Sequence, residues 1–500
     1  MNTLMGIDLG TTSLKVSIFK ETGELIASEV RDYPIQIPEP GFAEQDPIVW
    51  WAKLVNACQA LKVKRAKEFE AVIGIGLCGQ MHTQVYLDAD YNVLRPAITW
   101  MDQRSSGIVD QIKKDADACA LIFRETSNAA STTYTALHIK WVQENQPEIW
   151  KNVRYVLVAK DYIKFKLTDK MVTDFAEASG TLVFDVQNET WSDDAFRYFG
   201  IPKEVFPEVQ PSDVIIGKIS DAASILTGLK PGIPVVNGSS DNSASALGAG
   251  MASPGQVTLI IGTAGVITVC SDYPLVDEKN RTLCWHYCLQ KHWATLGIMQ
   301  TAGESLEWFK NTFDRQGEGT SPGDIFNQYN AAVQTVPEGS DGLIFLPYLN
   351  GERTPYWDSD AKGVFFGINL KTGKSHFIRS IMEGVSYALR NNIETVESLG
   401  ITINEVRAVG GGLKSQVWLE ILGKILRKPI STVSVRDTAN LGNILLCGHA
   451  LGLYPTYSEA VEKMVSVDQK VNFPQSSEVY EKRYPVFLDL YEKIKPLYRV

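Results

Sequence analysis

Two short segments rich in glycine and threonine have the residue types that bind phosphate. The first is Leu9-Gly10-Thr11-Thr12-Ser13, and its pattern returns in the second half of the chain as Ile261-Gly262-Thr263-Ala264-Gly265. Tight turns of this composition expose backbone N–H groups and hydroxyls, which suits a phosphate. The two copies therefore predict two similar domains that hold one polyphosphate between them.

Only the first copy is preceded by an acidic residue. This residue is Asp8, and the second copy has Ile260 in the same place. A carboxylate at the end of a buried strand is well placed to hold Mg²⁺ beside a phosphate. The alternative role is a carboxylate that caps the amides of the turn. The repeated glycine-threonine pattern favours the metal role for Asp8.

A second carboxylate belongs to Asp241, which follows the short apolar strand expected at Pro234–Gly238. The segment that begins there, Ser243–Gly250 included, has helical character. A carboxylate in this place could accept the proton of a hydroxyl that attacks a phosphate. Spacing alone leaves the alternative of a helix N-cap, for which Asp is a common choice.

Two further segments could contact a polyhydroxylated ligand. Met81-His82 follows the strand expected at Ala71–Leu77, and a histidine there can hydrogen-bond hydroxyls. A buried histidine whose hydrogen bonds are satisfied within the protein is the alternative. Asp102, in the segment Trp100–Arg104, offers a hydroxyl acceptor, and an exposed turn with an ion pair is its alternative.

A run of three glycines, Gly410-Gly411-Gly412, lies between an expected strand at Val406–Val409 and an expected helix at Ser415–Leu426. Glycines let the backbone approach a flat ligand or its phosphates closely. The run lacks the spacing of the dinucleotide-binding fingerprint. A tight turn without a ligand explains it equally well.

Strand, turn and helix signals alternate along the chain and predict an α/β fold. Pro47–Lys64 is typical of a helix, with Asp46 as its N-cap and proline at its first position. In the second half we expect a hairpin within Arg281–Met299 and a long amphipathic helix at Phe377–Leu399. The expected strands at the N-terminus are Leu4–Leu9, Leu14–Phe19 and Glu24–Val30.

The 500 residues exceed what one core can organise, so we expect two domains, 1–247 and 248–500. The net charge of −10 argues against a nucleic acid or an anionic membrane as partner. The seven scattered cysteines favour a reducing compartment, and with no signal peptide or apolar run of about 18 residues in this sequence we expect a cytoplasmic protein. The segment Cys284–Cys288 lacks the paired spacing of structural zinc sites, and we assign no zinc.

With these residues considered, the chain resembles the FGGY family of carbohydrate kinases from Gly6 to about Tyr454. The specific motifs are Gly363–Ile368 with His376-Phe377 and Glu383-Gly384, and Gly351–Trp357 just before them. The resemblance implies two ribonuclease-H-like domains, as in actin, hexokinase and the heat-shock chaperone ATPases, with ATP in the cleft between them.

The resemblance also implies a role for each candidate residue. Asp241 would be the general base, and Asp8 would hold Mg²⁺. The sugar would contact Met81, His82, Asp102, Asp241 and Asn242. The residues expected at ATP are Thr11, Thr12, Gly262, Thr263, Gly303, Gly411 and Gly412.

Within the family, the segments Gly79–His82, Trp100 with Asp102 and Arg104, and Asp241-Asn242 look like the xylulokinase subgroup, which implies ATP-dependent phosphorylation of D-xylulose at O5. The domain near residues 1–247 would carry the sugar and metal, and the second domain the nucleotide. The alternatives are the same chemistry on ribulose, L-xylulose, a pentitol or gluconate, and a non-kinase ATPase of the chaperone type. The partners expected are a small sugar and ATP, while a homodimer stays open because the sequence does not determine the oligomeric state.

Overall fold

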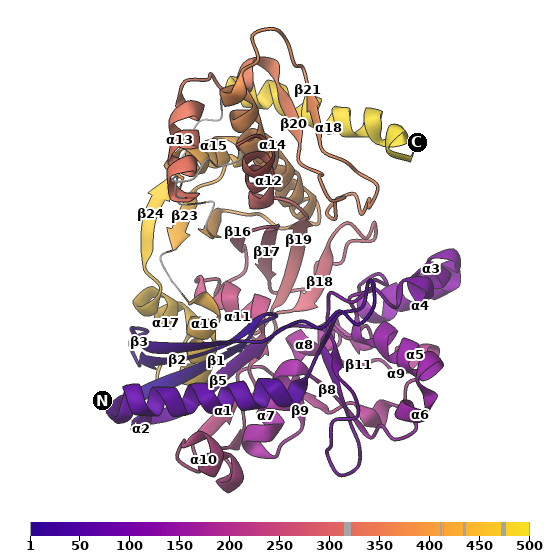
Figure 1. Cartoon of the computed structure of the whole chain (residues 1–500), viewed down its shortest axis with the longest axis vertical. Helices are drawn as coiled ribbons and strands as arrows, with labels where there is room; N and C mark the ends of the chain where they lie inside the picture. The colour runs from indigo at the N-terminus through magenta and orange to yellow at the C-terminus, as the bar shows by residue number, and fades with distance from the viewer. Residues whose placement is uncertain are drawn as a thin grey trace.

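The computed structural model describes residues 2–314, 322–410, 413, 415–433, 437–471 and 477–499. Each half of the chain forms an α/β lobe around its own seven-stranded sheet, with the N-terminal lobe below and the C-terminal lobe above in Figure 1. The sequence-based prediction of an α/β fold with two similar halves is confirmed.

The sheet of the N-terminal lobe is a β-meander extended by parallel strands. Strand β1 pairs antiparallel with β2 and parallel with β5. The strand order is β13 (Ile215–Lys218), β14 (Pro234–Val236), β5 (Val72–Gly79), β1 (Thr3–Leu9), β2 (Ser13–Lys20) and β3 (Leu25–Asp32), with β15 (Ser239–Ser240) also paired to β5.

The sheet of the C-terminal lobe repeats this construction. Strand β16 pairs antiparallel with β17 and parallel with β22, as β1 does with β2 and β5. The two glycine-threonine segments are the turns between these antiparallel pairs. The strand order is β18 (Leu283–His286), β19 (Trp293–Met299), β17 (Gly265–Ser271), β16 (Gln256–Ile261), β22 (Glu405–Val409), β23 (Ile430–Val433) and β24 (Val467–Val471).

Smaller sheets accompany both lobes. Four strands form one sheet in the N-terminal lobe: β4 (Glu44–Gln45), β7 (Ala97–Ile98), β6 (Gln84–Leu87) and β8 (Tyr155–Val158). The two-stranded sheets are β9 (Val172–Asp174) with β12 (Glu208–Gln210), β10 (Phe184–Asp185) with β11 (Thr190–Trp191), and β20 (Ile344–Leu346) with β21 (Val364–Phe366).

Helices cover the faces of the two central sheets (Figure 1). Those of the N-terminal half are α1 (Pro47–Lys64), α2 (Ala66–Glu70), α3 (Ser106–Lys114), α4 (Ala116–Thr126), α5 (Thr135–Asn145), α6 (Pro147–Trp150), α7 (Ala159–Thr168), α8 (Phe175–Ser179), α9 (Asp193–Phe199), α10 (Asp221–Thr227) and α11 (Asp241–Gly248). Those of the second half are α12 (Gly303–Phe313), α13 (Pro322–Gln334), α14 (Lys374–Glu397), α15 (Gln416–Leu426), α16 (Thr438–Ala450), α17 (Tyr457–Met464) and α18 (Glu478–Ile494). Across the described ranges, no helix has both the length and the apolar character that a membrane span requires.

Helix α1 has the bounds that the sequence predicts, and the side chain of Asp46 caps it by accepting from the Ile48 N–H at 2.8 Å. Its buried residues Trp50 and Leu54 join the core cluster that contains Ile7 of β1. Alternate residues of a strand face opposite sides of the sheet, so Leu4 of β1 packs into a different cluster, with residues of α16.

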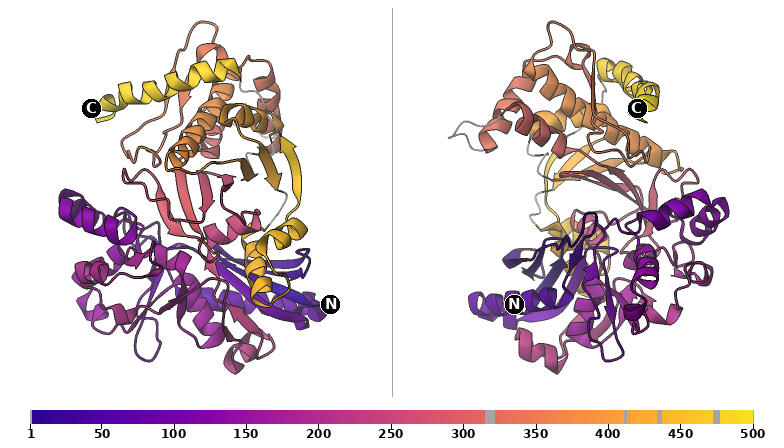
Figure 2. Two further views of the ribbon diagram at one scale, coloured as in Figure 1. Left: turned by 180° about the vertical axis from the view of Figure 1, so that it is seen from behind. Right: turned by 45° about the vertical axis from the view of Figure 1, so that its right-hand side comes forward.

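Helix α16 packs against the N-terminal lobe although it comes from the second half of the chain. In Figure 2 it lies with α17 beside the indigo strands of the N-terminal sheet. Two strand glycines allow this approach: a Cβ on Gly6 would lie 2.7 Å from Asn440 Oδ1, and one on Gly76 would lie 2.1 Å from the Asn443 carbonyl oxygen. Because α16 also contacts α11, it joins strand β1 to the helix that begins with Asp241.

Candidate active site

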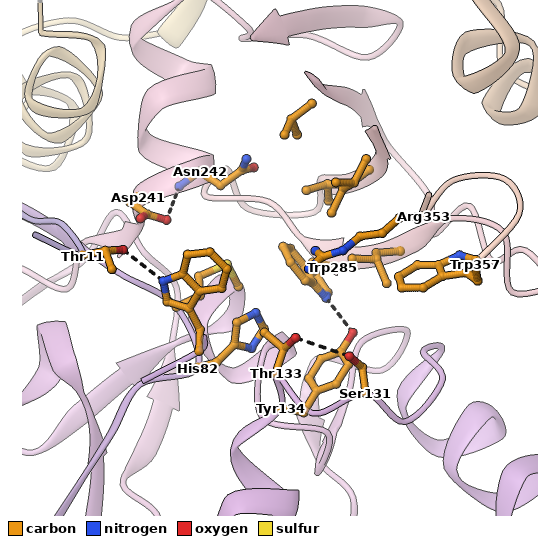
Figure 3. A pocket seen from close by; sticks show the side chains of 16 residues that line it. Thr11, His82, Ser131, Thr133, Tyr134, Asp241, Asn242, Trp285, Arg353 and Trp357 are labelled. Atoms are coloured by element: carbon orange, nitrogen blue, oxygen red, sulfur yellow. Dashed lines mark hydrogen bonds between the residues drawn. The ribbon is translucent and has the colours of Figure 1, made fainter. Parts of the chain in front are cut away.

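A cavity of about 200 Å³ lies between the two lobes and collects side chains from both. Thr11, His82 and Asp241 line it from the N-terminal half, and Trp285 and Arg353 line it from the second half (Figure 3). Met81, Trp100 and Asn242 are also part of its wall.

Asp241 is the first residue of α11, and its carboxylate borders this cavity (Figure 3). The N-cap of the helix is Ser240, whose hydroxyl accepts from the Ser243 N–H at 3.3 Å. The alternative of Asp241 as the N-cap is therefore wrong. Among the described residues its carboxylate accepts only local backbone hydrogen bonds, such as that from the Asn242 N–H to Oδ1 at 2.7 Å, so it remains available to a ligand.

Two buried lysines donate hydrogen bonds to the backbone that leads into α11. Lys160 and Lys164 each donate to the carbonyl oxygen of Asn237 at 3.1 Å. Both also pair with Asp161, at 2.7 and 2.8 Å, and all three side chains are fully buried. Buried lysines that pair with a carboxylate and also donate to a carbonyl oxygen restrict the backbone they contact, so this network helps to fix the strand end before Asp241.

Asp8 lies near the end of β1, opposite Cys78 of β5, whose thiol donates to Asp8 Oδ1 at 3.5 Å. Burial, followed by the charge of Asp437, raises the pKa of Asp8 to about 6. Burial and then the charge of Asp8 raise the pKa of Asp241 to about 7. A divalent cation near both carboxylates would offset their repulsion, so the pair fits Mg²⁺.

In the part of the chain that the structure describes, no group of three or more His, Cys, Asp or Glu side chains is arranged to hold a metal. This agrees with the way Mg²⁺ is bound at phosphates, through one or two carboxylates together with waters and phosphate oxygens. Asp8 thus stays a prediction as a metal residue.

The first glycine-threonine turn forms one edge of the cavity. The Gly10 N–H donates to the Ser13 carbonyl at 3.0 Å and closes the turn. The hydroxyl of Thr11 accepts from Trp100 Nε1 at 3.0 Å, as the dashed line in Figure 3 marks. Thr12 is exposed next to it; its carbonyl oxygen accepts from the Tyr33 N–H at 3.0 Å, and its hydroxyl is the group that can meet a ligand.

His82 enters the cavity from a left-handed backbone conformation, with φ of 65°. Its Nδ1 lies 2.7 Å from the carbonyl oxygen of Gly180. A carbonyl oxygen only accepts, so Nδ1 carries the proton and Nε2 presents a lone pair. Burial lowers the pKa of His82 to about 4, which keeps the ring neutral at physiological pH. The ring is therefore set to accept a hydrogen bond from a sugar hydroxyl.

Asp102 does not line the cavity in this structure. It is fully buried, and its carboxylate accepts from Arg104 Nε at 2.8 Å and from the Ala43 N–H at 2.6 Å. The alternative of an ion pair in a turn is thus what the structure shows, although the pair is buried. Its position supports the segment that carries Trp100.

A second cavity, of about 540 Å³, lies beside the other glycine-threonine turn and includes Gly262, Thr263 and Gly303. Helix α12 starts against this turn: the Ala302 N–H donates to the Thr263 carbonyl at 2.8 Å, and the Gly303 N–H donates to the Gly262 carbonyl at 2.9 Å. The structure thus brings these three predicted nucleotide residues together. The predicted residues Gly411 and Gly412 lie outside the described ranges.

Sequence reasoning missed several residues of the first cavity, among them Tyr134, Trp285 and Arg353. The indole N–H of Trp285 donates to the Tyr134 hydroxyl at 3.4 Å across the lobes. Trp285 sits in the segment inspected only as a metal site, and Arg353 in the motif Gly351–Trp357 that was given no role. No local pattern shows that these residues meet at one cavity.

Comparisons with known proteins cover nearly the whole chain. The model for the N-terminal domain of the FGGY family of carbohydrate kinases matches residues 3–248, and the model for its C-terminal domain matches residues 257–451. A xylulose kinase of Bacillus subtilis (strain 168) is 30% identical over 99% of this chain and 97% of its own length.

Two further relatives bear on the fold and the substrate. A crystal structure of xylulose kinase from Rhodospirillum rubrum superposes with a TM-score of 0.92 at 28% identity and covers 100% of both chains. A gluconokinase of Bacillus subtilis (strain 168) is 28% identical over 97% of this chain and 95% of its own length.

Proposed function

The chain belongs to the FGGY family of carbohydrate kinases, and from this membership we propose that it transfers the γ-phosphoryl group of ATP to O5 of D-xylulose. The family resemblance predicted from the motifs is confirmed, as is the two-domain kinase fold related to actin and hexokinase. The substrate and the roles of individual residues are the content of the proposal.

The observation that supports the proposal is the place of Asp241 in the wall of the smaller cavity, while the second glycine-threonine turn lines a separate, larger cavity. The carboxylate of Asp241 borders the smaller cavity, which also holds the neutral acceptor of His82 and the amide of Asn242. The first glycine-threonine turn contributes Thr11 to the same cavity, and the second turn lines the larger one. A sugar in the smaller cavity and ATP in the larger would meet beside Asp241.

In the proposed reaction, Asp241 accepts the proton of the O5 hydroxyl as O5 attacks the γ-phosphorus. A new O5–P bond forms, the bond from the γ-phosphorus to the β,γ-bridging oxygen breaks, and ADP leaves with that electron pair. His82 accepts a hydrogen bond from another hydroxyl and orients the sugar. Positioning and electrostatic stabilisation supply most of the catalysis in such transfers.

Asp8 is the residue that would hold Mg²⁺, directly or through water, beside the phosphates. The ion would supply positive charge that offsets the negative charge of the transferred phosphoryl group. The glycine-threonine turns add backbone N–H groups and hydroxyls to the same task. For the location of the reaction we propose the cytoplasm, because all seven cysteines are free thiols, which fits a reducing compartment.

Phosphorylation of D-gluconate is the second candidate. A guanidinium, that of Arg353, lines the smaller cavity and would suit a carboxylate, and one relative is named a gluconokinase. The xylulose kinases among the relatives favour the ketose.

A panel of substrates with ATP and Mg²⁺, followed by ADP release, tests the proposal. D-Xylulose, D-ribulose, L-xylulose, xylitol and D-gluconate are compared by kcat/KM, and the product is located by ³¹P NMR. We expect the highest kcat/KM for D-xylulose, with the phosphate on O5. A higher value for another sugar would overturn the substrate, and ATP hydrolysis independent of any sugar would favour the chaperone-type alternative.

A further inference from the structure

Arg353 is the one lysine or arginine among the described residues that line the smaller cavity. Its side chain extends toward Trp285 and the centre of the cavity (Figure 3). Across the described ranges, no carboxylate lies within salt-bridge distance of its guanidinium, and no hydrogen bond from the guanidinium is formed. The proposed phosphoryl transfer assigns this residue no role.

The backbone around Arg353 is fixed on both sides. Two hydrogen bonds join Thr354 to Ile298. The Thr354 N–H donates to the Ile298 carbonyl at 2.9 Å, and the Ile298 N–H donates to the Thr354 hydroxyl at 3.1 Å. Glu352 and Asp358 close the base of the loop through paired backbone hydrogen bonds of 2.8 and 2.9 Å. These hydrogen bonds attach the loop that carries Arg353 to the end of strand β19. The backbone position of Arg353 is therefore fixed.

The adjacent carboxyl group of Glu352 contacts backbone N–H groups and forms no ion pair with the guanidinium of Arg353. Oε1 of Glu352 accepts from the backbone N–H groups of Gln300 at 2.8 Å and Arg353 at 2.7 Å. Its Oε2 is buried without a hydrogen-bond partner among the described residues. Burial raises the pKa of Glu352 to about 8, although its two backbone hydrogen bonds and the charge of Arg353 act in the opposite direction. Glu352 therefore stabilises the loop through backbone hydrogen bonds, and the guanidinium of Arg353 can still donate to a ligand.

A guanidinium that is partly buried and unpaired is stabilised by a ligand atom that accepts its hydrogen bonds. Arginine has five N–H donors, no acceptor, and stays charged in proteins. Leaving such a group partly desolvated and unpaired is costly, so a ligand that supplies acceptor oxygens gains affinity. Oxygens of sp² carbon match the planar fork better than a hydroxyl does.

We propose that Arg353 is a specificity-determining residue that binds the sp² oxygen of an acyclic substrate, remote from the hydroxyl that faces Asp241. That oxygen is the C2 carbonyl of a ketose or the carboxylate of an aldonate. Asp241 from the N-terminal lobe and Arg353 from the C-terminal lobe would then contact two different groups of the same substrate. This inference rests on the proposed function and extends it to the rejection of pentitols, which lack such an oxygen.

The test compares Arg353→Met and Arg353→Lys with the wild type on D-xylulose, on its reduction products xylitol and D-arabitol, and on D-gluconate. We expect Arg353→Met to lower kcat/KM for D-xylulose about 10- to 100-fold, the range for a lost hydrogen bond to a charged group. The pentitols should change little, so the ratio of ketose to pentitol falls, while KM for ATP stays the same. Arg353→Lys should recover part of that ratio.

A neighbouring arginine provides the matched control. Arg281 pairs with Asp277 at 2.9 Å and does not line the smaller cavity, so Arg281→Met should leave the ratio unchanged. Equal losses for D-xylulose and the pentitols in Arg353→Met would overturn the inference, because a merely structural role predicts that result.

The outcomes separate the two proposals. A wild-type preference for D-gluconate would overturn the assignment of D-xylulose, and the loss in Arg353→Met is then measured on D-gluconate against the pentitols. A wild-type preference for D-xylulose with an unchanged ratio in Arg353→Met would leave the proposed function standing and remove Arg353 from substrate recognition.

Discussion

Asp241 lies close enough to the carboxylate of Asp8 for that charge to add to burial in raising its pKa, to about 7. Two carboxylates from different strand ends are thus coupled before any ligand binds. The native state binds the Asp241 proton more tightly than the unfolded chain does. The ionised form of Asp241 is therefore a destabilising feature of the folded protein.

The first prediction follows from this coupling. The unfolded chain loses the Asp241 proton near pH 4 and the folded chain near pH 7, so wild-type stability falls between these values. Asp241→Asn should have a higher Tm than the wild type at pH 8, and the difference should shrink toward pH 4. When Asp8→Asn is also present, the rise in Tm that Asp241→Asn produces at pH 8 should be smaller. The same difference at pH 8 with and without Asp8→Asn would contradict the coupling, and a difference that does not vary with pH would contradict the raised pKa of Asp241.

The second prediction concerns catalysis by Asp241. Asp241→Asn should lower kcat by about 10²- to 10⁴-fold, the usual range for a lost general base, with little change in the sugar dissociation constant. Asp221 offers a matched control, because it follows the N-cap Ser220 at the start of α10 as Asp241 follows Ser240. Asp221→Asn should leave kcat unchanged. Near wild-type turnover in Asp241→Asn would remove its catalytic role.

The third prediction concerns the metal. Asp8→Asn should raise the Mg²⁺ concentration that gives half-maximal activity, because the carboxylate proposed to hold the ion has lost its charge. Activity is titrated with Mg²⁺ at a fixed ATP concentration. Glu24→Gln, which alters an exposed ion pair with Lys20 at the other end of the strands β2 and β3, serves as the control. An unchanged titration curve in Asp8→Asn would exclude Asp8 from the metal shell.

The fourth prediction tests the orientation of His82. A Cβ at position 180 would lie 2.8 Å from His82 Nδ1 and 3.1 Å from Met81 Cε, so Gly180→Ala must displace the ring. We expect KM for the sugar to rise about tenfold or more while KM for ATP is unchanged. Gly107→Ala is the control, because a Cβ there meets nothing within 4 Å. Equal KM values for the sugar in the two variants would show that His82 does not position it.

The fifth prediction concerns the second glycine-threonine turn. A Cβ on Gly303 would lie 2.5 Å from the carbonyl oxygen of Gly262, so Gly303→Ala must push the turn and helix α12 apart. KM for ATP should rise with little change in the sugar dissociation constant measured without nucleotide. Both constants follow from steady-state kinetics and calorimetry. A rise confined to the sugar would place the nucleotide elsewhere.

Much of the fold could be predicted because its signals are local. The helix at Pro47–Lys64 follows from a capping Asp, a proline at its first position and apolar residues that face the sheet. The strands β1 and β2 and the turn between them follow from apolar runs on either side of a glycine-threonine segment. Asp8 and Asp241 were selected for the same reason, since each stands where a strand ends.

The family, the two similar halves and the segments that carry the phosphate turns and the carboxylates follow from the amino-acid sequence alone. Which side chains share a cavity becomes clear only from the folded chain. The fold placed Trp285 and Arg353 beside His82, buried Asp102 in a structural ion pair, and gave the N-cap role to Ser240 in place of Asp241. Propensity and periodicity act over a few residues, whereas a cavity between lobes depends on contacts between residues far apart in the chain, and these form only when both sheets are packed.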